Sequence, residues 1–189
     1  MTKLPRQQVA CASNGDPAIR IAKAVDVDAI VALVNSAYRG DSSRVGWTTE
    51  ADILGGQRTD TKEISELISE PRSVFLLCLR GSEMAGSVHV QQKDAVTAYM
   101  GMLVIKPVLQ GQGLGRRVIN EAERFARANW KAEQMQMQVI TLRDELIAFY
   151  ERCGYRRTGE IRPFPATDPR FGLPKVDGLK FEVLEKALD

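Results

Sequence analysis

The stretch MGMLVIKPVLQGQGLGRRVINEAERFARANW, residues 100–130, carries the pattern that decides the fold. It begins with a short apolar run, which predicts a buried strand, and Pro107 ends that run. Three glycines at every second position, Gly111, Gly113 and Gly115, then lead into a segment with apolar residues at helical spacing. The predicted order is therefore a strand, a glycine-rich turn and the first turn of a helix.

Such a junction favours a bound anion. The first backbone N–H groups of a helix have no intrahelical partner, and the helix dipole adds partial positive charge at the same end. Glycines let a ligand approach these amides closely, and Arg116 and Arg117 could add charge-assisted hydrogen bonds to a phosphate. The alternative is a tight connection that binds nothing.

The spacing of the glycines separates the known phosphate-binding motifs. A dinucleotide fingerprint G-x-G-x-x-G counted from Gly111 would need glycine where Arg116 stands, and the Gly-Lys-Ser/Thr ending of a P-loop is missing. The pattern Gln110-x-x-Gly113-x-Gly115 instead resembles the pyrophosphate-binding loop Q/R-x-x-G-x-G/A of the GNAT superfamily of N-acetyltransferases. The resemblance implies that coenzyme A is held by Gln110, Gly111, Gln112, Gly113, Leu114, Gly115 and Arg116.

A second motif follows at the distance that this family shows. Residues 149–155, FYERCGY, resemble the family's helix that ends in aromatic-Tyr-x-x-x-Gly-aromatic. The resemblance implies that Tyr150 binds near the acyl-CoA sulfur and acts as the general acid that protonates the departing thiolate. The alternative is a tyrosine that only packs, because Leu146, Phe149 and Cys153 share its helical face.

The resemblance also assigns roles to main-chain groups. It implies that the backbone of Met102, Leu103 and Val104 positions the acyl group, and that this strand splays from its neighbour to admit the pantetheine arm. Arg143 stands where many family members carry asparagine, so it is a candidate ligand for phosphate or substrate.

The base that deprotonates the acceptor amine is not carried over from the family. Many relatives have a glutamate just before the Met102 region, where this chain has Ala98 and Tyr99. His89, the only histidine, is a candidate base because its unperturbed pKa is roughly 6.5. A structural role on its strand is the alternative.

An irregular link between residues 38 and 60 is the expected acceptor side of the site. Trp47, Glu50 and Asp52 are candidate substrate contacts there, because carboxylates can bind a cationic amine or deprotonate it through water. The alternative is that both carboxylates are solvated in the first turn of a short helix around residues 49–54.

Periodicity organises the rest of the chain around this unit. We expect a flexible N-terminal leader over residues 1–17 and one GNAT domain over residues 18–189. The predicted order is strand, two helices, three strands, helix, strand, helix and two strands. The fold class is α/β (α+β), a GNAT fold with a central mixed, mostly antiparallel sheet of about seven strands and about four flanking helices.

Composition limits the classes of function. The 189 residues carry 26 basic and 24 acidic side chains, so a net charge of +2 argues against nucleic acid or a membrane as partner. The three cysteines lack C-x-x-C spacing, which argues against a zinc site and a disulfide framework, and no metal is expected. A reducing cytoplasm is the expected location, because no signal peptide or membrane span is recognisable.

The predicted function is transfer of an acetyl group from acetyl-CoA to a primary amine, with a small-molecule acceptor favoured. Two alternatives remain: a non-catalytic acyl-CoA sensor that acts through a protein partner, and a phosphate-binding protein unrelated to coenzyme A. The acceptor and the choice between monomer and homodimer stay open at this point.

Overall fold

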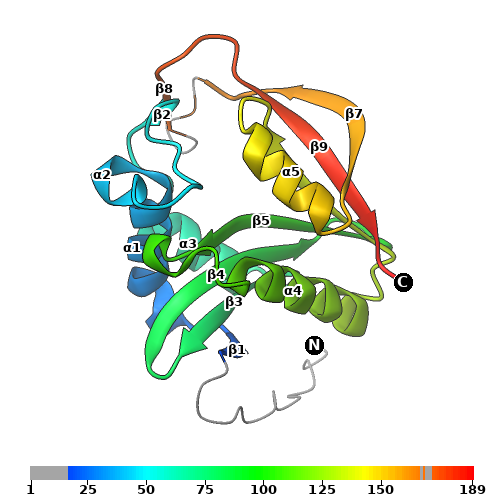
Figure 1. The fold of residues 1–189 in the computed structure, drawn as a ribbon. Coiled ribbons are helices and arrows are strands. Elements are labelled where there is room, and N and C mark those ends of the chain that lie inside the picture. The colour runs from blue at the N-terminus through cyan, green and yellow to red at the C-terminus, as the bar shows by residue number, and fades with distance from the viewer. Residues whose placement is uncertain (1–16, 167, 169–171) are drawn as a thin grey trace.

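The computed structural model describes residues 17–166, 168 and 172–189. The leader expected over residues 1–17 lies outside the described residues, apart from Pro17. A seven-stranded sheet with the order β1-β3-β4-β5-β6-β9-β7 forms the centre of the molecule (Figure 1). Its strands are β1 (Ala18–Ile21), β3 (Ser73–Arg80), β4 (Glu83–Gln92), β5 (Thr97–Ile105), β6 (Gln134–Ile140), β7 (Arg156–Pro163) and β9 (Lys180–Ala187). Only the β5–β6 pair of this sheet is parallel, which confirms the predicted mixed, mostly antiparallel arrangement.

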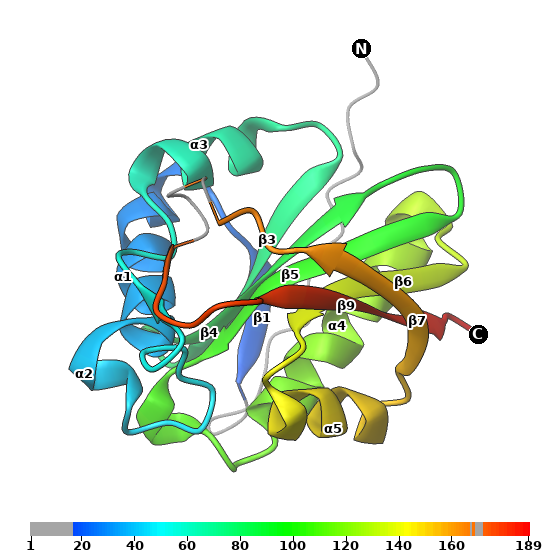
Figure 2. The same ribbon diagram turned by 90° about the horizontal axis from the view of Figure 1, so that it is seen from above.

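Helices cover both faces of the sheet (Figure 2). On one face, α1 (Val27–Tyr38) and α3 (Thr61–Ser69) bury Ile30 and Ile64 against Phe75 of β3. On the other face, α4 (Leu114–Trp130) and α5 (Asp144–Arg152) bury Ile119 and Ile147 in a second core. The helical spacing of these apolar residues explains both layers, because each helix turns its apolar stripe to the sheet. Two 3₁₀ turns, η1 (Ala24–Asp26) and η2 (Pro107–Leu109), precede α1 and the glycine turn.

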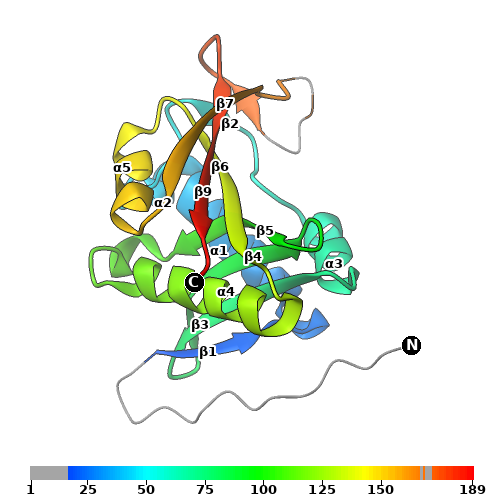
Figure 3. The same cartoon turned by 90° about the vertical axis from the view of Figure 1, so that its right-hand side faces the viewer.

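The sheet opens between its two parallel strands (Figure 3). Residues 97–99 of β5 pair with residues 134–136 of β6, and beyond this point each strand pairs only with its other neighbour. At the opening, the register of β4 against β5 shifts between Ser87 and His89, and Met102 has a φ of 46°. This left-handed residue marks a bulge that bends β5 away from β6. The splay expected from the family resemblance is thus present.

The irregular link differs from the prediction. No helix covers residues 49–54; the only helix of the link is α2 (Gly40–Ser43), and β2 (Leu54–Gly55) pairs with β8 (Leu173–Pro174). The N–H groups of Ile53 and Leu54 both donate to the carbonyl of Glu50, at 3.0 and 2.8 Å. A single turn forms in this way, and it stops because the next residues join a strand pair instead.

In the described part of the chain, no helix is both long and apolar enough to cross a membrane.

The helix after the glycine turn, α4, buries one charged residue that the apolar pattern places on its polar face. Glu123 occupies a polar position of α4 but is only 9 % exposed, because it accepts a hydrogen bond from the Tyr155 hydroxyl at 2.9 Å and pairs with Lys186 at 2.7 Å.

Candidate active site

The glycine turn leaves the N-terminus of α4 open. Gly111 and Gly113 have φ values of 77° and 78°, a conformation that favours glycine, and Gly113 is the N-cap of the helix. A Cβ atom added at either residue would meet no atom within 4 Å, so the space in front of the helix is free. At Gly115 an added Cβ would lie 3.3 Å from Cζ of Phe149, so here the glycine allows α5 to pack closely.

A cavity of about 400 Å³ connects this turn to β5 and α5. Ten of the residues predicted for the site line it, and they come from the link, from β5, from the glycine turn and from α5: Trp47, Leu103, Gln110, Gly111, Gly113, Leu114, Gly115, Arg116, Arg143 and Tyr150. Six further residues line the cavity without having been predicted for the site: Tyr38, Thr48, Ile105, Leu146, Phe149 and Arg152. A larger hollow of about 790 Å³ lies between α4 and the end of β9, and it shares no lining residue with this cavity.

Three residues predicted to bind the cofactor do not line the cavity. The Val104 side chain is 2 % exposed and belongs to the core beneath α1 and α3, and Met102 packs against the same core. The Gln112 side-chain oxygen accepts a hydrogen bond from Arg80 at 3.1 Å. Of this part of β5, only Leu103 and Ile105 reach the cavity wall.

Gln110 has a structural task that its place in the motif did not indicate. Its Oε1 accepts the backbone N–H of Trp47 at 3.0 Å, and its Nε2 donates to the Thr48 hydroxyl at 2.8 Å and to the Ile105 carbonyl at 3.2 Å. The first residue of the glycine motif therefore fastens the link to the end of β5. This contact also places Trp47 edge-on against Phe149, with ring centroids 5.5 Å apart.

Tyr150 projects from α5 into this cavity. Its side chain is nearly buried, and within the described residues its hydroxyl has no hydrogen-bond partner. Burial raises the pKa of Tyr150 far above its ordinary value, with the neighbouring Tyr38 as a second cause. The hydroxyl therefore keeps its proton throughout the neutral range and can donate it to an atom in the cavity.

Tyr38, at the end of α1, fixes the wall opposite Tyr150. Its hydroxyl donates a 2.6 Å hydrogen bond to the carbonyl of Leu103, in the part of β5 that has left β6. Burial raises the pKa of Tyr38, and the negative charge of Glu50 adds to the effect. The sequence signal for this residue was only its position where the helix pattern stops and the irregular link begins.

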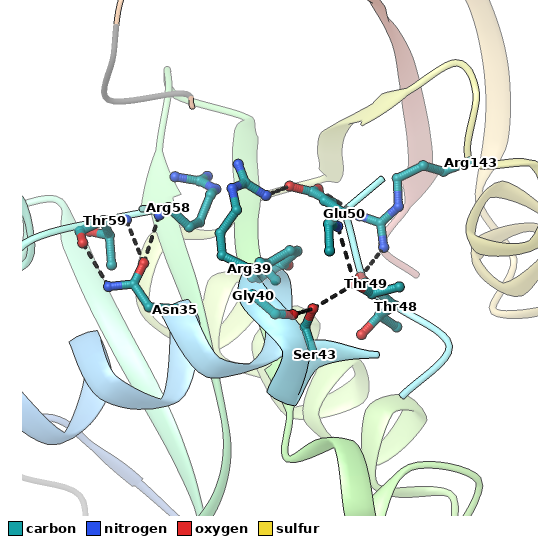
Figure 4. A network of polar contacts seen from close by, with 12 residues as sticks. Asn35, Arg39, Gly40, Ser43, Thr48, Thr49, Glu50, Arg58, Thr59 and Arg143 are labelled. Carbon is teal, nitrogen blue, oxygen red and sulfur yellow. Dashed lines mark hydrogen bonds and ion pairs between the residues drawn. The ribbon is translucent and has the colours of Figure 1, made fainter. Parts of the chain in front are cut away.

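Glu50 is the buried centre of an arginine cluster (Figure 4). One carboxylate oxygen pairs with Arg39 and the other lies 2.7 Å from Nη1 of Arg143, whose Nη2 also donates to the Thr48 carbonyl at 2.5 Å. The interpretation of Glu50 as a solvated carboxylate was therefore wrong. Asp52, in contrast, is exposed and pairs with Arg44 at 2.8 Å.

His89 lies in the core on the other side of β5. It is 5 % exposed, its Nε2 is 2.8 Å from the Ser73 hydroxyl, and its ring lies 5.0 Å from that of Phe75. Burial lowers its pKa to about 4, with the nearby Arg58 charge as a second cause. His89 does not line the cavity, and no aspartate, glutamate or histidine is among the lining residues in the described part of the chain.

These features fit an acyl-CoA. The free N-terminus of α4 and the open space at Gly111 and Gly113 suit a pyrophosphate, and Arg116 stands beside them on the cavity wall. The opening between β5 and β6 leaves main-chain groups of β5 without a strand partner on that side, as an extended pantetheine arm requires. Among the described residues, no group of three or more histidine, cysteine, aspartate or glutamate side chains could hold a metal ion.

The chain matches the model of one known protein family. The model of the acetyltransferase (GNAT) family matches residues 29–155, which include both motifs and all the residues that line the cavity. A search of curated proteins gave no match.

Solved structures share the fold at low sequence identity. An N-acetyltransferase from Staphylococcus aureus Mu50 superposes with a TM-score of 0.68 at 13% identity, covering 91% of this chain and 97% of that chain. The protein yncA from Salmonella typhimurium, solved with its cofactor acetyl-CoA, gives 0.66 at 19% identity, covering 93% and 95%. The spermidine/spermine N-acetyltransferase SpeG from Vibrio cholerae gives 0.64 at 15% identity, covering 93% and 94%.

Proposed function

The chain belongs to the GNAT family of acetyltransferases, and from that premise we propose that it transfers the acetyl group of acetyl-CoA to the primary amine of a small molecule. One observation carries the proposal: a single cavity joins the open N-terminus of α4 to the Tyr150 hydroxyl and to the splayed part of β5. The free thiols Cys78 and Cys153 suit a reducing cytoplasm, where we place the reaction.

Donor binding rests on the main chain of the glycine turn. The N–H groups at the start of α4 can bind the pyrophosphate, and Arg116 can add a charge-assisted hydrogen bond. The unpaired groups of β5 near Leu103 can bind the pantetheine amides in the way that a neighbouring strand would. The hydrogen bond from Tyr38 holds the Leu103 carbonyl in place.

The proposed reaction is a direct displacement. The lone pair of the amine attacks the thioester carbonyl carbon, the C–N bond forms and the C–S bond breaks. Tyr150 gives its proton to the departing sulfur, the amine nitrogen releases one proton to solvent as the amide forms, and Tyr150 takes one proton back from solvent before the next turnover. A tyrosine hydroxyl is protonated at neutral pH even at its ordinary pKa of about 10, so the proton is present when the substrate binds.

The cavity favours a neutral amine without a dedicated base. Its charged lining residues in the described part of the chain are Arg116, Arg143 and Arg152. Nearby positive charge disfavours a protonated amine and so lowers the pKa of a bound acceptor. The absence of a carboxylate or an imidazole from this wall also motivates a second candidate, an acyl-CoA sensor that does not turn over.

Release of free thiol tests the two candidates. The protein is incubated with acetyl-CoA and a broad panel of amines, and the thiol of coenzyme A is measured. Acceptor-dependent release supports the transferase. Tight binding of acetyl-CoA with no release across the panel refutes it and supports the sensor.

A further inference from the structure

A guanidinium without an acidic partner lies next to the proposed acceptor side. Arg58 precedes α3, and its backbone N–H donates a 2.6 Å hydrogen bond to Oδ1 of Asn35 on α1. The same Asn35 also binds the main chain of Thr59 at 2.9 Å through its Nδ2, so this segment is held firmly (Figure 4). The half-buried Arg58 side chain forms no ion pair within the described residues.

Three uncharged rings lie near the Arg58 charge. Its Cζ is 6.0 Å from the centroid of the Tyr38 ring, and the charge also acts on His89 and Tyr99. Burial raises the pKa of both tyrosines and lowers that of His89, so none of the three carries a charge at neutral pH. Arg58 is thus partly removed from water without a compensating negative group.

Tyr38 links this guanidinium to a second one in the cavity wall. Cζ of Arg143 is 5.9 Å from the centroid of the same ring, so the two cations flank one aromatic side chain. Glu50 does not neutralise Arg58, because its single negative charge is already shared by Arg39 and Arg143. The acceptor side of β5 therefore carries an excess of positive charge around Tyr38.

We propose that this arginine cluster selects an acceptor that carries a carboxylate beside its amine, as in an α-amino acid, with Arg58 and Arg143 as the groups that bind the carboxylate. The inference rests on the proposed transferase function and names its substrate class. A bound carboxylate supplies the negative charge that the cluster lacks, and planar guanidinium groups bind carboxylates with paired hydrogen bonds.

The same charge excludes other acceptors. A polyamine would bring further positive charge next to Arg58 and Arg143, which like-charge repulsion disfavours. The single negative charge of Glu50, the one carboxylate of the cluster, is already shared by two arginines and does not offset that of a polycation. A different occupant for Arg58 is a phosphate of coenzyme A. In that case substitution of Arg58 changes the KM for acetyl-CoA, which distinguishes the two.

The first test compares matched acceptors. Each common α-amino acid is paired with its amide, which keeps the amine and the side chain but lacks the negative charge, and spermidine is added as a polycation. We expect kcat/KM for the preferred acid to exceed that of its amide by about 10- to 100-fold, the effect of one or two hydrogen bonds to a charged group. Equal or better turnover of the amides or of spermidine overturns the inference while leaving the transferase intact.

The second test uses variants of the cluster. Arg58→Gln raises KM for the acid about tenfold or more, leaves the rate with the amide unchanged and leaves KM for acetyl-CoA unchanged. Arg58→Lys restores part of the preference, since the charge returns without the planar fork. Arg72→Gln removes an exposed charge just before β3 and serves as the matched control with wild-type preference. A change in the acetyl-CoA KM of Arg58→Gln instead assigns Arg58 to the donor and overturns the inference.

Binding separates this inference from the proposed function. If no acceptor releases thiol, the transferase proposal fails, and the same acid and amide pairs are titrated calorimetrically into the protein loaded with coenzyme A. Preferential binding of acids that is lost in Arg58→Gln supports the cluster as a carboxylate site. Equal binding of acid and amide, or no binding of either, refutes it.

Discussion

The donor side and the acceptor side of the cavity are built in different ways. The proposed donor site is one continuous segment, residues 110–116, whose shape depends on left-handed glycines and on the start of a single helix. The acceptor wall is backed by a cluster of Arg39, Glu50 and Arg58 from the link with Arg143 from the start of α5, of which only Arg143 lines the cavity, and these two parts of the chain meet only in the folded protein. A local site of the first kind is visible in a sequence motif, whereas a site of the second kind needs the fold.

The largest expected effect is a loss of kcat on substitution of Tyr150, the residue that joins the two sides. Tyr150→Phe removes the hydroxyl that faces the cavity, and kcat should fall by about 10²- to 10⁴-fold, the contribution typical of a general acid. Acetyl-CoA affinity, measured by calorimetry, should stay unchanged. Tyr155→Phe is the matched control, since that hydroxyl binds Glu123 away from the cavity, and it should retain kcat. Normal turnover of Tyr150→Phe would exclude this tyrosine as the acid.

The acceptor wall should depend on Glu50 for its stability. Glu50→Gln leaves two buried guanidinium groups without their shared anion, and the free energy of unfolding should drop by roughly 3–5 kcal/mol in a denaturant titration. Asp52→Asn, which affects an exposed pair with Arg44, should unfold like the wild type. Equal stability of the two variants would contradict the buried cluster.

The donor side should respond to Gly113→Val in binding. Valine must adopt an unfavourable left-handed conformation there, at a cost of about 1–2 kcal/mol, and its side chain fills the free space in front of α4. We expect the Kd for acetyl-CoA to rise about 10- to 100-fold. Gly81→Val is the matched control: it has a φ of 61° and equally open surroundings, but it lies in the β3–β4 turn, so it should lower stability and keep the Kd.

The smallest effect at neutral pH is expected for His89→Gln. The folded pKa of about 4 lies below the unfolded value of 6.5, so the neutral ring contributes stability above pH 6.5 that is lost as the pH falls toward 4. The wild type should lose roughly 3 kcal/mol over this window, and the variant should not. Its kcat at neutral pH should match the wild type; a loss above about 100-fold would make His89 the base after all.

Most of the fold could be predicted from the sequence, because the apolar periodicity of each helix or strand is a local pattern. The strand over residues 73–80 and the helix beginning at Thr61 follow directly from their patterns, and the splay of β5 followed from the family resemblance. Gly113 and Tyr150 line the cavity, as their motifs indicated. Their roles in binding and proton transfer remain predictions that the variants above test.

The acceptor wall could not be predicted because its partners are distant in the sequence. Glu50 is separated from Arg143 by 93 positions, and its surroundings looked like a solvated helix start. No sequence pattern pointed to Arg58, because its place beside the site depends on the hydrogen bond to Asn35 and on the contact with the Tyr38 ring. Residues 49–54 were expected to form a helix, but the pairing of β2 with β8 decided their conformation, and this contact joins two loops.

That two-residue pairing joins the link over residues 38–60 to the segment that contains β8. Leu54 faces Pro174 and Gly55 faces Leu173, while the Lys175 ammonium donates to the Ala51 carbonyl at 2.6 Å and closes the same junction. We therefore expect an insertion in one segment to displace the other. To give this scaffold the substrate specificity of a relative, both segments must therefore be exchanged together.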